Sequence, residues 1–234
     1  MEVCQILVEG PSDLKVIGRI LEVLDSTLKD VSEQLLLSEQ EKKQQKKRLY
    51  QSQRKDLWIY INAVEGCSKL EQVVGVTRYV KCQGSMDWPI DKNLIIFDAD
   101  TIDNKGGFSK RQQQIVKVME QSEAQCKIPW HLFLLPNNSD DGMLETLLLR
   151  ALSSNATSIV PCVNGLVECF HAHNASCELK EKHKVALFAW GCCDKANKDL
   201  RFEPSLKGDA TWDYTSEEFG PLREFLTEHL DLTS

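Results

Sequence analysis

The stretch "NLIIFDAD" (residues 93–100) is the best starting point for the fold, because it joins a buried strand to a pair of acids. Residues 94–97 are four apolar side chains in a row, which predicts a short strand covered on both faces. The strand then ends on Asp98 and Asp100, one residue apart. Like charges repel at short range, and a desolvated carboxylate is costly without a cation beside it. Either the two acids lie in solvent, or the end of this strand binds a cation.

Three further apolar runs predict strands, and these are "VCQILVE" (3–9), "DLWIYINAVEG" (56–66) and "WHLFLLP" (130–136). A helical pattern of apolar residues follows each of the four runs. Strands that alternate with helices imply parallel β-α-β units with right-handed crossovers. The predicted fold class is therefore α/β, with a Rossmann-like parallel sheet flanked by helices.

The length of 234 residues suits a single domain, 1–234, with a core of about residues 1–155 and two additions. After the first strand and its helix, a helical pattern runs on through residues 26–55, which predicts a long helical insertion that breaks or forms a hairpin. Residues 156–234 are expected to form a C-terminal α/β extension. There we predict a helix near 161–183, a strand in "KVALFAW" (184–190) and a terminal helix in "EEFGPLREFLTEHL" (217–230).

The composition favours a soluble protein over a membrane protein or a disulfide-rich secreted protein. Apolar residues make up 42% of the chain and charged residues 27%, as in ordinary soluble proteins, and no apolar run approaches the roughly 18 residues of a membrane span. The N-terminus enters a strand-like run with no basic segment before it, so we expect no signal peptide. Nine cysteines, scattered through apolar segments, indicate reduced thiols and a cytoplasmic location. The net charge of −7 gives no global attraction to nucleic acid, so any such contact needs a local basic patch or a metal ion.

Acids gather where an open parallel sheet binds its ligands, which is at the carboxyl ends of the strands. Glu9 stands at that end of the first strand, as Asp98 and Asp100 do at the end of the third. If these strands are neighbours, three carboxylates share one crevice. Mg²⁺ prefers oxygen ligands and retains several waters, so two or three carboxylates suit it. With a phosphate as a further ligand, such a site can activate water and stabilise a leaving oxygen.

This arrangement resembles the Toprim domain, whose motifs are a Glu at the end of the first strand, usually followed by Gly, and an Asp-x-Asp at the end of a later strand. The motifs read "LVEGPSD" (7–13) and "IIFDAD" (95–100) here, and the resemblance covers roughly residues 3–150. The chain is more similar still to small stand-alone Toprim proteins related to the overcoming-lysogenization-defect (OLD) nucleases. In those proteins a Pro-Asn turn, a Gly and then a Glu follow the fourth strand, as in "FLLPNNSDDGMLETLLL" (133–149).

The resemblance implies a nuclease that uses Mg²⁺ or Mn²⁺ to hydrolyse phosphodiester bonds of DNA or RNA. It implies that Glu9 acts as general base or metal ligand, that Asp98 and Asp100 bind metal, and that Glu145 is a further acid at the site. Asp13 is a secondary candidate, although an acid in the first turn of a helix also favours the helix dipole. The resemblance further implies work beside an ATPase partner, in phage defence or DNA processing.

Basic residues are candidates for contacts with the phosphates of a nucleic acid. Nucleases of this kind use a lysine late in the domain to neutralise phosphate charge, and the resemblance points first to Lys184 and second to Lys182. The run "EKKQQKKR" (41–48) offers a nucleic-acid contact through five side chains, namely Lys42, Lys43, Lys46, Lys47 and Arg48. The alternative for this run is a solvated helix tip, which charge runs usually are.

A different class of function also fits the sequence, namely a binding module in which a Toprim scaffold with an idle metal site docks a partner protein or senses a nucleotide. The acidic net charge favours the module, whereas the presence of both acidic motifs favours the nuclease. The segment 26–55 separates the two further, because a coiled hairpin with an apolar seam would indicate a homodimer or partner interface.

Overall fold

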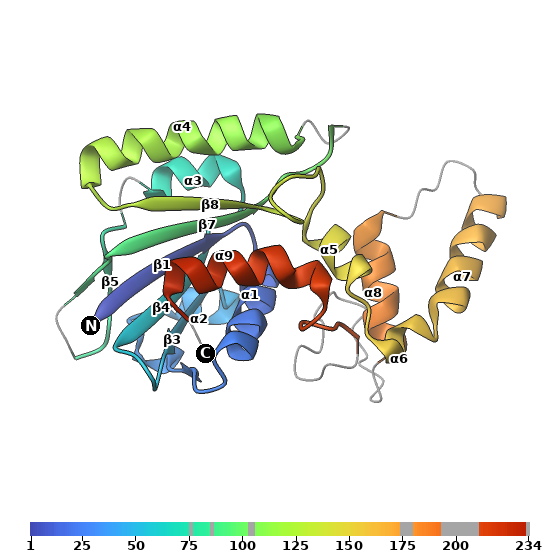
Figure 1. Ribbon diagram of the computed structural model, residues 1–234, viewed down its shortest axis with the longest axis horizontal. Helices are drawn as coiled ribbons and strands as arrows, with labels where there is room; N and C mark the ends of the chain where they lie inside the picture. The colour runs from blue at the N-terminus through green and yellow to red at the C-terminus, as the bar shows by residue number, and fades with distance from the viewer. Residues whose placement is uncertain (75–76, 85–86, 103–105, 174–179, 193–210, 233–234) are drawn as a thin grey trace. The chain divides into compact units, whose positions relative to one another are not determined.

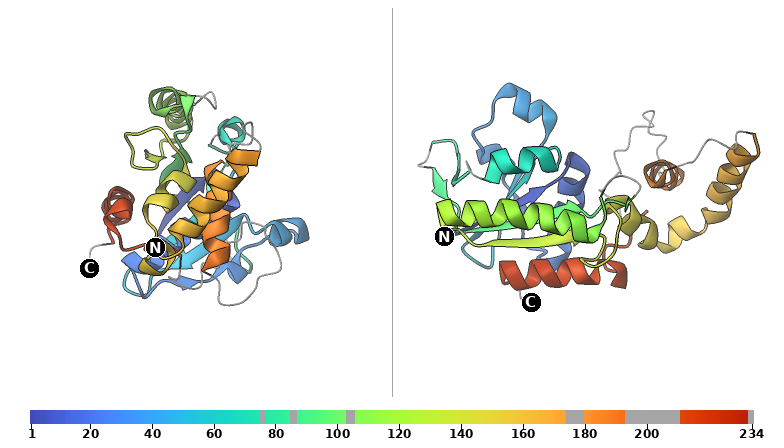
Figure 2. Two further views of the ribbon diagram at one scale, coloured as in Figure 1. Left: turned by 90° about the vertical axis from the view of Figure 1, so that its right-hand side faces the viewer. Right: turned by 90° about the horizontal axis from the view of Figure 1, so that it is seen from above.

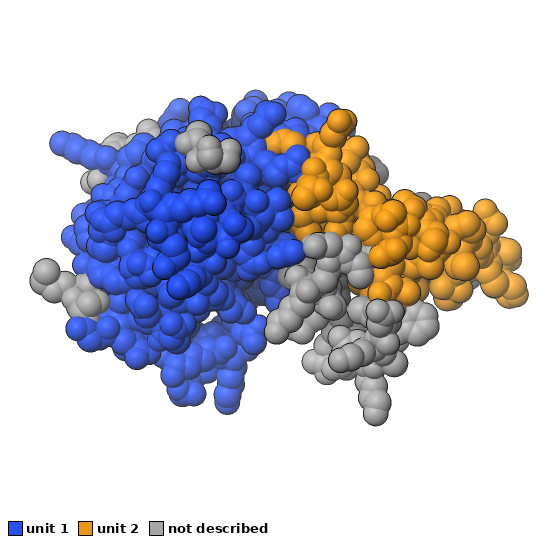
Figure 3. Space-filling model, turned by 60° about the horizontal axis from the view of Figure 1, so that its bottom comes forward, with its two compact units in different colours: residues 1–143, 221–234 blue, residues 144–220 orange. Residues whose placement is uncertain are grey.

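The structure of the protein is a computed structural model. It describes residues 1–74, 77–84, 87–102, 106–173, 180–192 and 211–232, apart from the side chains of residues 122–126, 171, 182 and 190. The chain divides into two compact units, each of which is described by itself (Figure 3). Unit 1 comprises residues 1–143 and 221–234, and unit 2 comprises residues 144–220.

Unit 1 is built on a six-stranded sheet with the strand order β2-β3-β4-β1-β7-β8 (Figure 1). Its strands are β1 (Glu2–Val8), β2 (Lys29–Asp30), β3 (Lys47–Gln51), β4 (Leu57–Ala63), β7 (Lys92–Asp98) and β8 (Trp130–Leu135). Neighbours among β4, β1, β7 and β8 pair in parallel, whereas β3 and β2 add an antiparallel edge. The predicted α/β class is confirmed at this level, as a mixed fold with a mostly parallel central sheet flanked by helices.

Helices cover both faces of this sheet, as Figures 1 and 2 show. The helices α1 (Pro11–Leu24) and α9 (Gly220–Leu230) lie on one face, and α3 (Cys67–Val74) and α4 (Phe108–Cys126) lie on the other. Coverage on both faces explains the continuous apolar runs, because no side chain of residues 3–8 or 94–97 is exposed to solvent. On the side of α3 and α4, the core cluster includes Leu7, Phe97 and Ile115. The strands of the sheet are thus packed on both faces, and polar loops follow their ends.

The prediction of a long helical insertion at 26–55 is wrong. The segment contains β2, a 3-10 turn η1 (Ser32–Gln34), a short helix α2 (Glu39–Gln44) and β3. Gln45 ends α2 in a left-handed conformation (φ 49°), and Leu49 of β3 is then fully buried against the sheet. Residues 38–48 carry no apolar side chain that could anchor a helix, so pairing with the edge of β4 outweighs helix propensity. A two-stranded ribbon of β5 (Tyr79–Val80) and β6 (Trp88–Pro89) completes the strands of the described residues in unit 1.

Unit 2 is helical where the structure describes it. Its elements are α5 (Leu144–Arg150), α6 (Ser154–Thr157), α7 (Val160–His173), α8 (Glu181–Gly191) and a 3-10 turn η3 (Glu217–Phe219). The predicted strand 184–190 is therefore wrong, because it lies within α8, and the described part of the extension contains no strand. Val185, Phe188 and Ala189 are buried at helical spacing, and a short apolar run alone does not separate strand from helix. No helix in the described ranges is both long enough and apolar enough to cross a membrane.

Candidate functional site

The carboxyl ends of β1 and β7 lie side by side. The two strands pair in parallel with Val8 opposite Ile96, so Glu9 follows the end of β1 beside the last residues of β7. Paired strands lie about 4.8 Å apart, and Asp98 is the final residue of β7. The structure therefore brings Glu9, Asp98 and the following Asp100 to one edge of the sheet, as the sequence predicts. All three residues are partly exposed.

Asp100 is held by its backbone and by an ion pair. Its backbone is left-handed, with φ 60°, and its carbonyl accepts a hydrogen bond of 2.9 Å from the amide of Gly142. Its carboxylate pairs with the guanidinium of Arg111 in the first turns of α4. The two side chains are only 23% and 14% exposed, so water screens this pair poorly. Burial opposes the charge of Arg111, but the hydrogen bond and charge of Asp100 outweigh it and raise the pKa of the guanidinium.

Two glycines shape the loop that carries Asp100. A Cβ atom at Gly106 would overlap the Cβ of Asp100 and press on the carbonyl of Ala99. Gly107 has φ 98°, which side chains rarely allow, and its amide donates to the carbonyl of Ala99 at 2.9 Å. The amide of Phe108, which begins α4, donates to the Oδ1 of Asp141 at 2.6 Å. The glycines therefore hold the chain close to Asp100 and lead it directly into the helix that supplies Arg111.

Asp13 has the structural role that an acid in a first helical turn favours. Its Oδ2 accepts a hydrogen bond of 2.8 Å from the amide of Gly10, the residue before α1, and its side chain is buried. One carboxylate oxygen of Glu9 is also buried, and the Glu9 carbonyl accepts from the amide of Glu65 at 2.8 Å. These contacts fix the turn that carries Glu9 at the end of β1.

The basic stretch 41–48 is largely neutralised by acids. Lys42 pairs with Glu39 at 2.8 Å, Lys47 with Glu41 at 2.6 Å and Arg48 with Asp30 at 2.8 Å. Lys46 binds Glu65 at 2.5 Å, and this bond, with a second from Lys69, lowers the pKa of Glu65 to about 2. Only Lys43 of the five lacks an ion pair within the described ranges. The predicted nucleic-acid contact through this stretch is thus left with little unpaired charge.

The later candidates lie in unit 2, so their part in the strand-end site stays a prediction. Glu145 is in the first turn of α5, and Lys184 is in α8. The two helices pack together, and the hydroxyl of Thr146 donates to the carboxylate of Glu181 at 2.6 Å. The structure therefore places this acid and this lysine on adjoining helices. The side chain of Lys182 lies outside the described residues.

Sequence reasoning missed Arg111. Its one sequence signal is a basic residue in the first turns of a predicted helix, where the helix dipole disfavours positive charge. Such a residue indicates a nearby acid, and here the acid is Asp100. Within the described ranges, no group of three or more His, Cys, Asp or Glu residues is arranged to hold a metal ion. The donors at the strand ends are the hard oxygens that Mg²⁺ requires, but Asp100 faces Arg111.

Comparison with known proteins identifies a family model that covers most of the chain and a solved structure of similar fold. A family model described as "Protein of unknown function (DUF3226)" matches residues 4–231. No curated protein matches the sequence significantly. A crystal structure of a hypothetical protein from Pyrococcus horikoshii is similar with a TM-score of 0.54 and 13% identity, over 99% of this chain and 96% of that one. At this identity the similarity supports the fold alone.

Proposed function

Because the chain belongs to DUF3226, a family of proteins of unknown function, we propose its activity from the strand-end site. The protein is a Toprim-like, OLD-related nuclease that hydrolyses phosphodiester bonds of DNA or RNA with Mg²⁺ or Mn²⁺. One observation carries the proposal: β1 and β7 are neighbours in a parallel sheet, so Glu9, Asp98 and Asp100 leave the same edge. Open α/β sheets bind their ligands at this edge.

Each residue of the site has a defined role in this proposal. Asp98 and Asp100 would hold the metal ion, and Glu9 would be a third ligand or the base that accepts a proton from the attacking water. A bound divalent ion supplies an activated water and neutralises charge on the phosphate. Arg111 pairs with Asp100, and its planar guanidinium could also bind a phosphate oxygen of the substrate.

A second candidate function is a binding module with an idle metal site. The observation that favours it is the ion pair between Asp100 and Arg111, because a carboxylate engaged by a guanidinium is less available to a cation. The two candidates differ in whether a divalent ion can replace Arg111 at Asp100. Metal binding is therefore the property to measure first.

The test is a calorimetric titration of Mg²⁺ and Mn²⁺ into three proteins: the wild type, the double variant Asp98→Ala/Asp100→Ala, and Glu71→Gln. Glu71 is an exposed carboxylate on α3, so its variant controls for the loss of negative charge. The proposal expects binding by the wild type and the control but not by the double variant. Equal binding by all three proteins would contradict it. So would a wild type that binds no metal even with an uncleavable phosphorothioate oligonucleotide present.

A further inference from the structure

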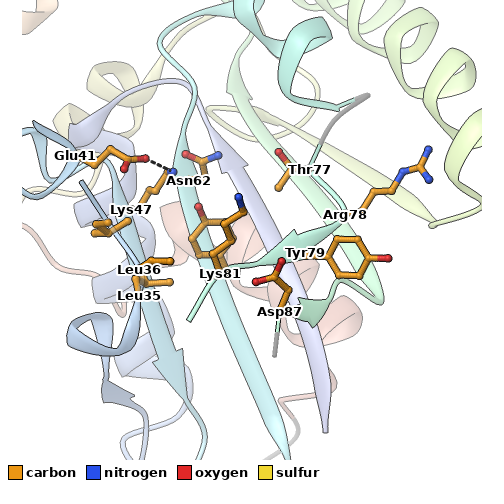
Figure 4. Close-up of a pocket in the computed structure, with 12 residues that line it drawn as sticks. Leu35, Leu36, Glu41, Lys47, Asn62, Thr77, Arg78, Tyr79, Lys81 and Asp87 are labelled. Carbon is orange, nitrogen blue, oxygen red and sulfur yellow. Dashed lines mark hydrogen bonds and ion pairs between the residues drawn. The ribbon is translucent and has the colours of Figure 1, made fainter. Parts of the chain in front are cut away.

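A cavity of about 570 Å³ lies over β4, within unit 1 (Figure 4). Tyr60 and Asn62 of β4 line it. The other lining residues are Leu35, Leu36, Leu37, Glu41 and Lys47 on one side and Thr77, Arg78, Tyr79, Lys81 and Asp87 on the other. The volume is in the range of small-molecule sites, which is about 300–1,000 Å³. The strand-end carboxylates do not line the cavity, so it is a separate feature of the molecule.

Two polar side chains of β4, those of Tyr60 and Asn62, line this cavity. Asn62 is 9% exposed and Tyr60 is 5% exposed, and neither side chain has a hydrogen-bond partner among the described residues. Their polar atoms face the solvent in the cavity, so a ligand that enters can replace the hydrogen bonds that water makes there. Burial raises the pKa of the Tyr60 hydroxyl, which therefore stays protonated and able to donate.

The unpaired charge at the cavity favours an anion. Glu41 neutralises Lys47 at 2.6 Å, but Arg78 and Lys81 have no ion-pair partner within the described ranges. Asp87 is the other acid at the wall, and it can accept a hydrogen bond from a hydroxyl or amino group. A ligand that fits therefore carries negative charge at one point and hydrogen-bond donors at another.

Apolar surface completes the chemistry of the cavity. Leu36 is 60% exposed and Tyr79 is 52% exposed, and both side chains line the cavity. Figure 4 shows Lys47 and Asn62 at one end of the view and Tyr79 at the other, with Lys81 between them. An exposed aromatic ring beside cations is the usual platform for a base and its phosphate.

We propose that this cavity binds a nucleoside monophosphate group, either a free nucleotide or the terminal nucleotide of a nucleic-acid strand. Tyr79 contacts the base at one end of the cavity, Lys81 attracts the phosphate, and Asn62 hydrogen-bonds to the phosphate at the other end. A bare phosphate would make no contact with the ring of Tyr79, and the hydrocarbon chain of a fatty acid would lie against the polar groups of Asn62 and Lys81. The site is independent of the proposed nuclease activity.

The experiment measures binding in the presence of EDTA, so that no metal at the strand ends contributes. The probes are the four 5′-monophosphates, adenosine, inorganic phosphate, and a short single-stranded oligonucleotide with and without a 5′-phosphate. The proteins are the wild type, Lys81→Ala, Asn62→Ala and Lys43→Ala. Lys43 is exposed, lacks an ion pair among the described residues and does not line the cavity, so its variant matches the charge change of Lys81→Ala. Circular dichroism verifies that each variant is folded.

We expect at least one monophosphate to bind more tightly than adenosine or inorganic phosphate. Lys81→Ala and Asn62→Ala should weaken this binding about tenfold, while Lys43→Ala leaves it unchanged, since one charged hydrogen bond corresponds to about a tenfold change. Tighter binding of the 5′-phosphorylated oligonucleotide than of the free nucleotide identifies a strand end as the ligand, and the reverse identifies a free nucleotide. Equal loss in all three variants, phosphate binding as tight as nucleotide binding, or no binding of any probe would overturn the proposal.

Discussion

Replacing Arg111 by Met tests the link between the ion pair and the metal site. The variant keeps most of the aliphatic length but leaves Asp100 without its cation. Exposed ion pairs contribute below about 1 kcal/mol and loss of a partner from a buried pair costs about 3–5 kcal/mol. With side chains 14% and 23% exposed, we expect an intermediate loss of about 2 kcal/mol. For a chain of 234 residues this corresponds to a fall in melting temperature of about 4–8 °C.

The same substitution should improve metal binding. A divalent ion must draw Asp100 away from Arg111, so removing the arginine should tighten Mg²⁺ binding. We expect about a tenfold gain in affinity, which is about 1.4 kcal/mol, since the ion then no longer has to break the whole pair. Urea unfolding followed by circular dichroism and calorimetric titration measure the two effects, with Lys42→Met, from an exposed pair, as the control. A coupling energy below about 0.5 kcal/mol in the double-mutant cycle with Asp100→Asn, or weaker Mg²⁺ binding, would refute the reasoning.

Two further predictions concern the loop and the C-terminal helix. Gly107→Ala should lower the free energy of unfolding by about 1–2 kcal/mol and weaken metal binding, because φ 98° strains a side chain beside Asp100. Gly165→Ala, inside helix α7 with open space around it, should instead raise the free energy of unfolding by about 0.5–1 kcal/mol and leave metal binding unchanged. Equal effects of the two substitutions in urea unfolding and titration would argue against the loop's role. Burial, with the neighbouring charge of His131, lowers the pKa of His229, so the unfolded chain takes up this proton first. The contribution of His229 to the free energy of unfolding should be complete above about pH 6.5 and be lost as the pH falls to the folded-state pKa. The urea midpoints at pH 7.5 and pH 5 should therefore differ less in His229→Phe than in the wild type. An unchanged difference would disprove the assignment.

The parallel part of the fold could be predicted because its strands are buried on both faces and so read as continuous apolar runs. The segment 26–55 could not, because its Glu, Lys and Gln residues favour a helix locally, while the structure places Leu49 in the core by pairing β3 with β4. The apolar run in α8 failed for a related reason: its length and composition suit either a strand or a helix, and packing against α5 decides between them.

At the site, the sequence predicts that Glu9, Asp98 and Asp100 share one edge, because the order of strands and helices fixes which ends meet. It does not predict the partner of Asp100. That contact depends on the left-handed backbone at Asp100 and on the direction of Arg111 from α4, and both arise from the tertiary structure. The open cavity beside Asn62 also escapes sequence reasoning, since it is made by segments that are far apart in the chain.

The most direct test of the account is a cleavage assay with labelled DNA and RNA, single- and double-stranded, in Mn²⁺ and in Mg²⁺. It compares the wild type with Glu9→Gln, which keeps the shape of the side chain but removes its charge, and with Glu71→Gln as the matched control. The account predicts metal-dependent cleavage by the wild type and the control, abolished by EDTA and reduced at least about 100-fold in Glu9→Gln. Absence of cleavage of every substrate, or cleavage that survives in Glu9→Gln, would contradict it.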